Sequence, residues 1–347
     1  MKQFDKKSVS PDLYSRNTLI SYLVEKLLNG QYHNKKCKLL DVGGYGANLH
    51  HYVEQIDEFT ILEKKAKPAQ LDENIKYVEG SILKAPFSDR AFDVVVSTDM
   101  IEHLDKPDRP PAVRELLRVA KKYLILGMPC KNDLTENAER IVNEMFATVT
   151  GKNHEFLNEH IQYGLPKEER IEQVIKDMNL PYFKINEGNL MNWYIQYLYT
   201  SSQMDQLHNE KQFEFNRFYN ENLFRLGNLR APTYRTFFVV ANDGYFSQEE
   251  IMSELADQWK WDPQAFMELL KKAFQDMRIS MNRGAKLLQV QNQLTNLQVE
   301  YEKEHAHFEH TKKQLIEKDQ IIQKARASMS VYKETIAEAR DVLTARE

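Results

Sequence analysis

Residues 39–46 read LLDVGGYG: two apolar residues, an aspartate, and then three glycines within four positions. This is the pattern of a buried strand that runs into a tight turn. Glycine has no Cβ, so a turn of this composition lets a ligand lie directly against the backbone. The stretch therefore predicts a ligand site at the end of a strand. The ligand is a dinucleotide, a phosphate, or another cofactor that carries a nucleoside.

Strand-like and helical segments alternate around this turn. Apolar residues recur at helical spacing over 11–29, and residues 111–120 also read as a helix. Short apolar runs, which read as strands, occupy residues 38–42, 59–63, 75–79, 92–98, 123–128, 182–185 and 234–241. Alternation at this spacing predicts an α/β fold, a doubly wound Rossmann-like sheet with crossover helices on both faces.

Composition narrows the class of protein. The chain has 347 residues, and its 47 Lys and Arg against 51 Asp and Glu give a net charge of −4, a balance that does not call for nucleic acid. Two cysteines far apart in sequence predict a reducing compartment. The N-terminus lacks an apolar signal core, and no apolar run approaches the roughly 18 residues that span a bilayer. We expect a cytoplasmic protein without a transmembrane segment, with a peripheral position at the inner membrane face as the alternative.

The C-terminal part of the chain carries a heptad repeat. The first core position is apolar nine times in succession, at Leu287, Leu294, Tyr301, Phe308, Leu315, Ile322, Met329, Ile336 and Leu343. The second core position is polar in the middle, at Glu304, Thr311 and Lys318. This pattern predicts a long coiled coil and self-association; the alternative is one long amphipathic helix packed on its own domain.

These segments divide the chain into three parts. We expect a catalytic domain over 1–243 with an acceptor lid at about 131–180, a linker of short helices over 244–286, and the coiled coil over 287–347. The last residues carry no helix stop signal, which leaves open that further domains follow in the native chain.

The glycine turn does not match the two commonest phosphate-binding motifs. Gly44 and Gly46 supply the start of G-x-G-x-x-G, but the third glycine position is Leu49, and the phosphate loop G-x-x-x-x-G-K-[ST] is absent. A cofactor without phosphates is therefore favoured.

Four motifs in order resemble class I S-adenosylmethionine-dependent methyltransferases. They are LLDVGGYGANL (39–49), ILEKK (61–65), YVEGSILKAPF (77–87) and FDVVVSTDMIEHL (92–104), and the similarity extends over residues 10–243. The resemblance implies the seven-stranded sheet of that family and S-adenosylmethionine as cofactor. It further implies that the cofactor is bound by Asp41, Gly43, Gly44, Gly46, Glu63, Ser81, Ile82 and Ser97. Glu63 would hold the ribose hydroxyls, and Ser81 and Ile82 would contact the adenine. The sequence departs from the family at Ser81, where an aspartate is usual, and at Tyr45 and Ala47, where glycines are usual.

The fourth motif also carries the candidate catalytic residues. His103 is the expected base, because an imidazole pKa near 6.5 suits removal of a proton from a hydroxyl at neutral pH; Asp99 lies beside it at the strand end. Asp99-x-x-Glu102-His103 resembles the E-x-x-E-H metal motif of some methyltransferases. Positions i, i+3 and i+4 share one helix face, so the three could hold Mg²⁺ or Mn²⁺, with His154 or His160 as a fourth ligand. The alternative is that Asp99 caps a helix and Glu102 is a first-turn carboxylate.

The expected reaction is methyl transfer to a sugar hydroxyl of a bacterial surface polysaccharide, which would cap the chain and stop its growth. This expectation comes from the resemblance to coiled-coil-bearing proteins that cap O-antigen or S-layer polysaccharides. It implies a glycan acceptor, bound by the polar segment NHEFLNEHIQYGLP (153–166), and glycosyltransferase modules as partners. One alternative is O-methylation of a catechol- or quinone-like small molecule. Another is a non-catalytic coiled-coil scaffold with a cofactor-binding domain.

Overall fold

The structure is a computed structural model, and it describes residues 4–28, 37–44, 48–53, 56–68, 71–202, 209–222, 224, 228–258 and 263–344. The chain divides into two compact units, Met1–Ser280 and Met281–Glu347. The first unit contains the sheet and the candidate site, and the second consists of the C-terminal part of one long helix.

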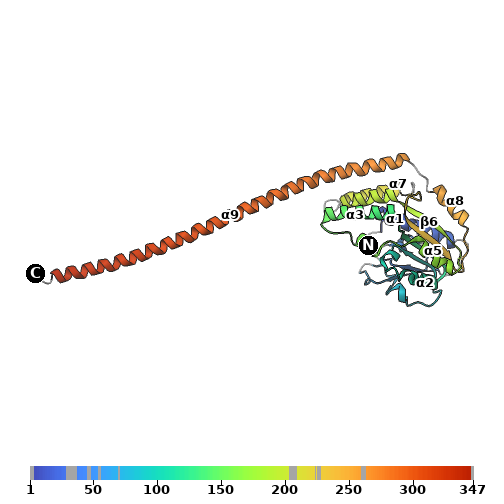
Figure 1. The fold of residues 1–347 in the computed structure, drawn as a ribbon, viewed down its shortest axis with the longest axis horizontal. Coiled ribbons are helices and arrows are strands. Elements are labelled where there is room, and N and C mark those ends of the chain that lie inside the picture. Colours follow the sequence, from blue (N-terminus) through green and yellow to red (C-terminus); the bar gives the residue numbers. More distant parts are fainter. Residues whose placement is uncertain are drawn as a thin grey trace. The chain divides into compact units, whose positions relative to one another are not determined.

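A seven-stranded sheet forms the centre of the first unit (Figure 1). Its order is β3-β2-β1-β4-β5-β7-β6. Neighbouring strands from β3 to β5 are parallel, and β7 runs antiparallel to both of its neighbours. The strands are β1 (Lys38–Val42), β2 (Glu58–Glu63), β3 (Ile75–Glu79), β4 (Phe92–Thr98), β5 (Ala120–Pro129), β6 (Tyr182–Asn189) and β7 (Thr233–Ala241). The prediction of a Rossmann-like seven-stranded sheet is confirmed, and β4 is buried along its whole length, as its unbroken apolar run requires.

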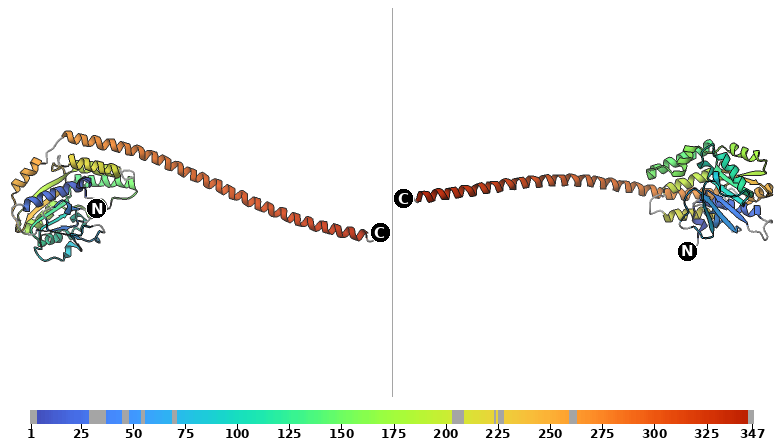
Figure 2. Two further views of the ribbon diagram at one scale, coloured as in Figure 1. Left: turned by 180° about the vertical axis from the view of Figure 1, so that it is seen from behind. Right: turned by 90° about the horizontal axis from the view of Figure 1, so that it is seen from below.

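Helices cover both faces of the sheet. One face packs against α1 (Pro11–Leu28) and α7 (Asn209–Asn222), whose buried residues include Leu19, Leu23 and Phe215. The other face packs against α2 (Arg109–Val119) and α5 (Glu168–Asp177) through residues such as Val113 and Ile175. The views agree that α1 and α2 lie on opposite sides of the sheet (Figures 1 and 2).

A third, smaller core lies among the helices that follow β5. It joins α3 (Asp133–Thr150), α4 (Glu155–Tyr163) and α6 (Leu190–Ser202), and at its centre Trp193 stacks on Tyr234 with ring centroids 4.4 Å apart. The predicted lid at 131–180 therefore contains two different parts. α3 and α4 form a layer of their own, whereas α5 belongs to the core of the sheet.

Four short 3-10 helices connect strands or precede α1. They are η1 (Lys6–Ser8), η2 (Leu49–His51), η3 (Ile82–Lys84) and η4 (Ile101–His103). The last three each follow the C-terminal end of a parallel strand, the edge at which open α/β sheets bind ligands. They bring the predicted site residues to this edge.

The core of the first unit extends past Asp243, where we had placed its end. α8 (Gln248–Gln258) buries Ile251 and Leu255 against the face that α1 covers, and Glu254 pairs with Lys26 of that helix. The segment from the end of β7 through α8 is therefore part of the folded unit and is not a linker. Trp259 and Trp261 lie outside the described residues.

The predicted linker of short helices over 244–286 is wrong from residue 263 onward. A single helix, α9 (Pro263–Thr344), includes this stretch and the heptad region (Figure 2). Between residues 297 and 329 the apolar heptad residues are 48 to 69% exposed, namely Leu297, Tyr301, Phe308, Leu315, Ile322 and Met329. The C-terminal helix is thus confirmed, and its assembly into a coiled coil stays a prediction.

Candidate functional site

The glycine turn after β1 is packed so closely that its first two glycines tolerate no side chain. Gly43 has φ +80°, and a Cβ there would lie 2.9 Å from Cγ of Met100. A Cβ at Gly44 would lie 2.1 Å from Oδ2 of Asp41. The turn is therefore held between the Asp41 carboxylate and the residue that precedes η4. Gly46, also predicted to bind the cofactor, lies outside the described residues.

Two carboxylates mark the ends of β1 and β2. Asp41 is 3% exposed, and burial raises its pKa to about 7; the nearby charge of Glu63 adds to this rise and that of Arg16 opposes it. Glu63 is half-buried at the end of β2, and its Oε1 accepts backbone N–H bonds from Lys64 at 2.7 Å and Lys65 at 3.2 Å. Glu63 therefore has a fixed orientation at the edge of the sheet, with its Oε1 bound to the backbone that follows β2.

The three remaining predicted cofactor residues differ in availability. Ser81 begins η3, and its Oγ accepts the N–H of Leu83; Ile82 beside it is buried. Ser97 is fully buried within β4, and its hydroxyl donates to the carbonyl of Val42 at 3.2 Å. The side chain of Ser97 therefore braces β4 against β1 and does not face a ligand.

Asp99 does not share a face with Glu102 and His103, contrary to the helix-based prediction. It precedes η4 and adopts φ +50°, so the residues are not in i, i+3, i+4 positions of one α-helix. Its carboxylate accepts bonds from Arg235 (Nε to Oδ1 and Nη2 to Oδ2, both 2.6 Å) and from Arg16. These two guanidinium charges outweigh the effect of burial and lower the Asp99 pKa. The structure therefore places Asp99 in a buried ion cluster, outside the group of potential metal ligands. It does not cap η4, whose N-cap residue is Met100 and which has no side-chain cap.

Glu102, His103 and His160 do come together. A ligand atom from each lies within 4.8 Å of the other two, and the Nε2 atoms of the two imidazoles are 3.4 Å apart. Glu102 is fully buried, and neither of its carboxylate oxygens has a hydrogen-bond partner. An unpaired buried carboxylate is costly, so a proton or a cation is needed to balance it.

Two further carboxylates fix the orientation of these imidazoles. His103 Nδ1 lies 2.6 Å from Glu159, and His160 Nδ1 lies 2.9 Å from Glu139, which also accepts a bond from the Tyr234 hydroxyl at 2.6 Å. Because a carboxylate accepts, each Nδ1 carries the proton and each Nε2 is left as a lone pair. Two lone pairs that face each other repel unless a proton or a metal ion lies between them. Carboxylate–histidine pairs of this kind are typical of metal sites.

The pKa values follow from burial and from these partners. Burial raises the pKa of Glu102 to about 8, and the charge of Asp99 adds to the rise. Burial and the neighbouring His160 lower the pKa of His103, so its imidazole is neutral near pH 7. Burial opposes protonation of His160 as well, but its bond to Glu139 and the nearby charge of Glu102 raise its pKa overall.

His154 and Arg109 hold the surrounding backbone. His154, which we considered as a fourth ligand, begins α4, and its Nδ1 accepts the N–H of Leu157. Arg109 was not predicted. It is 5% exposed and donates to four carbonyls, those of Glu102 and Leu104 in and after η4 and those of Tyr163 and Gly164 at the end of α4. It therefore ties the element that carries His103 to the element that carries His160.

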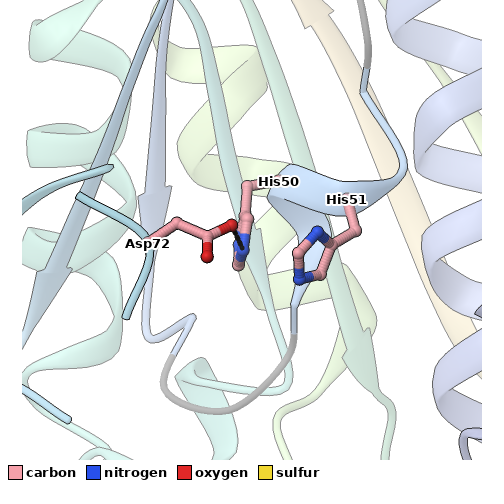
Figure 3. A group of neighbouring side chains, drawn as sticks. All are labelled: His50, His51 and Asp72. Atoms are coloured by element: carbon pink, nitrogen blue, oxygen red, sulfur yellow. Dashed lines mark ion pairs between the residues drawn. The ribbon is translucent and has the colours of Figure 1, made fainter. Parts of the chain in front are cut away.

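His50, His51 and Asp72 form a second group of potential metal ligands (Figure 3). His50 and His51 come from η2, and Nε2 of His50 lies 3.5 Å from Oδ2 of Asp72. The group lines a pocket that also includes Asp41 and Gly44. Asp72 is exposed, and His51 stacks on Phe4 with ring centroids 4.0 Å apart. The contact with Asp72 therefore holds His50, and the stacking on Phe4 holds His51; these contacts account for both imidazoles without a metal ion.

Comparison with known proteins agrees with this geometry. Residues 40–126 match the methyltransferase domain family. The matched segment runs from β1 to β5 and includes the glycine turn, Glu63 and η4.

Two curated relatives from Rauvolfia serpentina are similar to part of the chain. Ajmaline N-methyltransferase is 29% identical over 136 residues, which cover 33% of this chain and 46% of the relative. Norajmaline N-methyltransferase is 31% identical over 100 residues, which cover 25% of this chain and 34% of the relative. The chain therefore spans less than half the length of either relative.

Among solved structures, an S-adenosylmethionine-dependent methyltransferase from Archaeoglobus fulgidus has a TM-score of 0.40 and 14% identity. The alignment covers 67% of this chain and 95% of that one. In the part of the chain that the structure describes, no helix combines the length and the apolar character that crossing a membrane requires.

Proposed function

We propose that the chain binds S-adenosylmethionine and transfers its methyl group to an acceptor. The observation that carries the proposal is the position of the matched segment. Within residues 40–126, the glycine turn, Glu63 and η4 all lie at the C-terminal edge of neighbouring strands. The methionine end of the cofactor would lie against Gly43 and Gly44, and its ribose against Glu63.

The acceptor we propose is a hydroxyl group, and His103 is the base. A neutral imidazole accepts the proton that a hydroxyl loses as it attacks the methyl group. The bond from Glu159 holds the ring with Nε2 as the acceptor atom. Phe156 lies against His103 with ring centroids 5.6 Å apart and is 49% exposed. Phe156 thus offers apolar surface beside the base, although Nζ of Lys65 lies over its ring at 5.6 Å, and apolar surface of this kind suits one face of a sugar ring. The role in capping a surface polysaccharide is proposed from the sequence resemblance alone.

A second candidate is methyl transfer to nitrogen. The two curated relatives are N-methyltransferases, and this favours an amine acceptor. An amine of a small molecule would need the same base and the same cofactor site. Incubation with labelled S-adenosylmethionine and a panel of oligosaccharides, catechols and amines separates the candidates. Label on a sugar oxygen supports methyl transfer to a glycan hydroxyl. Label found only on amines or catechols would show that the acceptor is a small molecule instead. Cofactor binding without any transfer would support the scaffold alternative.

As an alternative to His103 acting as the base, we further propose a metal ion at Glu102, His103 and His160; an Nε2 atom that binds a metal ion cannot also accept a proton. The donor set fits, because the oxygens of Glu102 have no hydrogen-bond partner and the Nε2 atoms of His103 and His160 face each other 3.4 Å apart, beside that carboxylate. Two imidazoles with one carboxylate favour Mn²⁺ over Mg²⁺, which prefers oxygen ligands. A bound ion would lower the pKa of an acceptor hydroxyl.

Calorimetry with Mn²⁺ tests the metal site without reference to activity. We expect His160→Ala to weaken Mn²⁺ binding at least tenfold. His310→Ala, which removes an exposed histidine of α9, is expected to leave binding unchanged. Equal loss in both variants, or no binding by the wild type, would remove the ion from the proposal.

A further inference from the structure

Arg16 of α1 is a buried cation with unused hydrogen-bonding capacity. Its side chain is 9% exposed, its Nη1 donates to Asp99, and its buried Nε has no hydrogen-bond partner. A guanidinium has five N–H donors, and a buried donor without an acceptor costs free energy. This feature therefore needs a partner that the surrounding side chains do not supply.

The position of Arg16 joins α1 to the candidate cofactor site. Asp99, its partner, directly follows β4, and the next residue, Met100, packs against Gly43 of the glycine turn. β4 pairs with β1, with Val42 opposite Ser97. The charge of Arg16 also reaches the carboxyl of Asp41, at the end of β1, and opposes the rise in its pKa. The guanidinium thus lies near the ends of both strands, on the side of the glycine turn.

Of the two arginines that bind Asp99 in the described part of the chain, Arg16 makes fewer bonds to carboxylates. Arg235, the other arginine in this cluster, makes two bonds to Asp99 and two to Asp12. Arg16 shares Asp99 with it and makes a single bond there. The bond from Nη1 to Asp99 orients the guanidinium plane, and the buried Nε–H is left without an acceptor among the described residues.

We propose that Arg16 binds the α-carboxylate of the methionine end of S-adenosylmethionine. The assignment rests on the proposed function. A guanidinium recognises a carboxylate with parallel, charge-assisted bonds, which are stronger than bonds to neutral groups. Arg16 would then make α1 part of the cofactor site, and would select cofactors that carry an amino-acid end over nucleosides that lack one.

Two nucleosides test this selection directly. S-adenosylhomocysteine carries the carboxylate, and 5′-methylthioadenosine lacks the amino-acid end but keeps the adenosine. Binding of both is measured by calorimetry to the full chain and to Arg16→Gln. We expect Arg16→Gln to bind S-adenosylhomocysteine about 10- to 100-fold more weakly and 5′-methylthioadenosine within about twofold of the wild type.

Two further variants keep the test decisive. Arg16→Lys retains the charge beside Asp99, and we expect it to fold and to show a smaller loss, specific to S-adenosylhomocysteine. Arg217→Gln removes an exposed arginine that pairs with Asp5, and we expect it to change neither affinity. Equal weakening of both nucleosides in the Arg16 variants, or unchanged S-adenosylhomocysteine binding, would overturn the assignment. If the wild-type chain binds neither nucleoside, the proposed function fails first.

Discussion

Asp41 shows how one buried side chain makes the candidate site sensitive to pH. It is nearly inaccessible at the end of β1, and burial raises its pKa to about 7 from an ordinary value of 3.8. The protonated form therefore stabilises the folded chain fully below pH 3.8. This contribution is lost progressively as the pH rises to 7, because the unfolded chain has already ionised there.

We predict that Asp41→Asn, which is neutral at every pH, gains stability over the wild type as the pH rises. The Tm difference between the two ligand-free proteins should be larger at pH 8 than at pH 5, because only the wild type must ionise a buried carboxyl. Asp105→Asn, at an exposed aspartate, serves as the control. Thermal unfolding of all three at both pH values checks this, and a pH-independent difference for Asp41→Asn would contradict it.

The residues of the candidate site could be predicted where a local sequence motif contains them. Their hydrogen-bond partners, which come from distant parts of the chain, could not. The glycines, Glu63, Glu102 and His103 all belong to motifs that follow apolar runs. Asp99 belongs to the same motif, but its role is decided by Arg235, which lies 136 positions away, and by Arg16. Glu139 and Tyr234 hold His160 from distant elements in the same way. Sequence spacing carries no information on such contacts.

At the scale of elements, strands were easier to predict than helix boundaries. Apolar runs such as 92–98 mark strands buried on both faces, and β4 occupies that range. The start of α9 was misplaced because only the heptad repeat, which begins at Leu287, was taken to mark the long helix. A proline is well tolerated in the first turn of a helix, where its missing N–H has no acceptor to lose, and Pro263 is the first residue of α9.

The tie between η4 and α4 gives an element-scale prediction. Replacing Arg109 with methionine leaves four carbonyls at the ends of these elements without their donor. We expect the free energy of unfolding to fall by about 2–4 kcal/mol, and Mn²⁺ affinity to fall as Glu102 and His160 lose their fixed separation. Arg114→Met, at an exposed position of the same helix, should change neither. Urea unfolding and calorimetry measure both effects; equal unfolding free energies for the two variants would refute the role of Arg109.

At the scale of the whole molecule, α9 carries a row of apolar side chains that no other part of the described chain buries. Its apolar heptad residues are exposed and lie along one side of the helix, whereas a surface helix normally buries its apolar side. A seam of this kind is buried when two or more such helices pair. We propose that α9 pairs with the same helix of a second chain, with Glu304, Thr311 and Lys318 making the middle of the seam polar.

This pairing predicts how the chain assembles. The full chain should self-associate in sedimentation velocity, whereas a chain that ends at Ser280, the end of the first unit, should sediment as a monomer. In the full chain, Phe308→Glu with Leu315→Glu places charges on adjacent first core positions and should also give monomers, because a buried unpaired charge is costly. Lys313→Glu changes the charge on the opposite side of the heptad and should leave assembly intact. Each form should still bind S-adenosylhomocysteine, since every cofactor residue proposed here lies in the first unit. Self-association that survives both the truncation and the paired glutamates would move the interface away from α9 and onto the sheet-bearing unit.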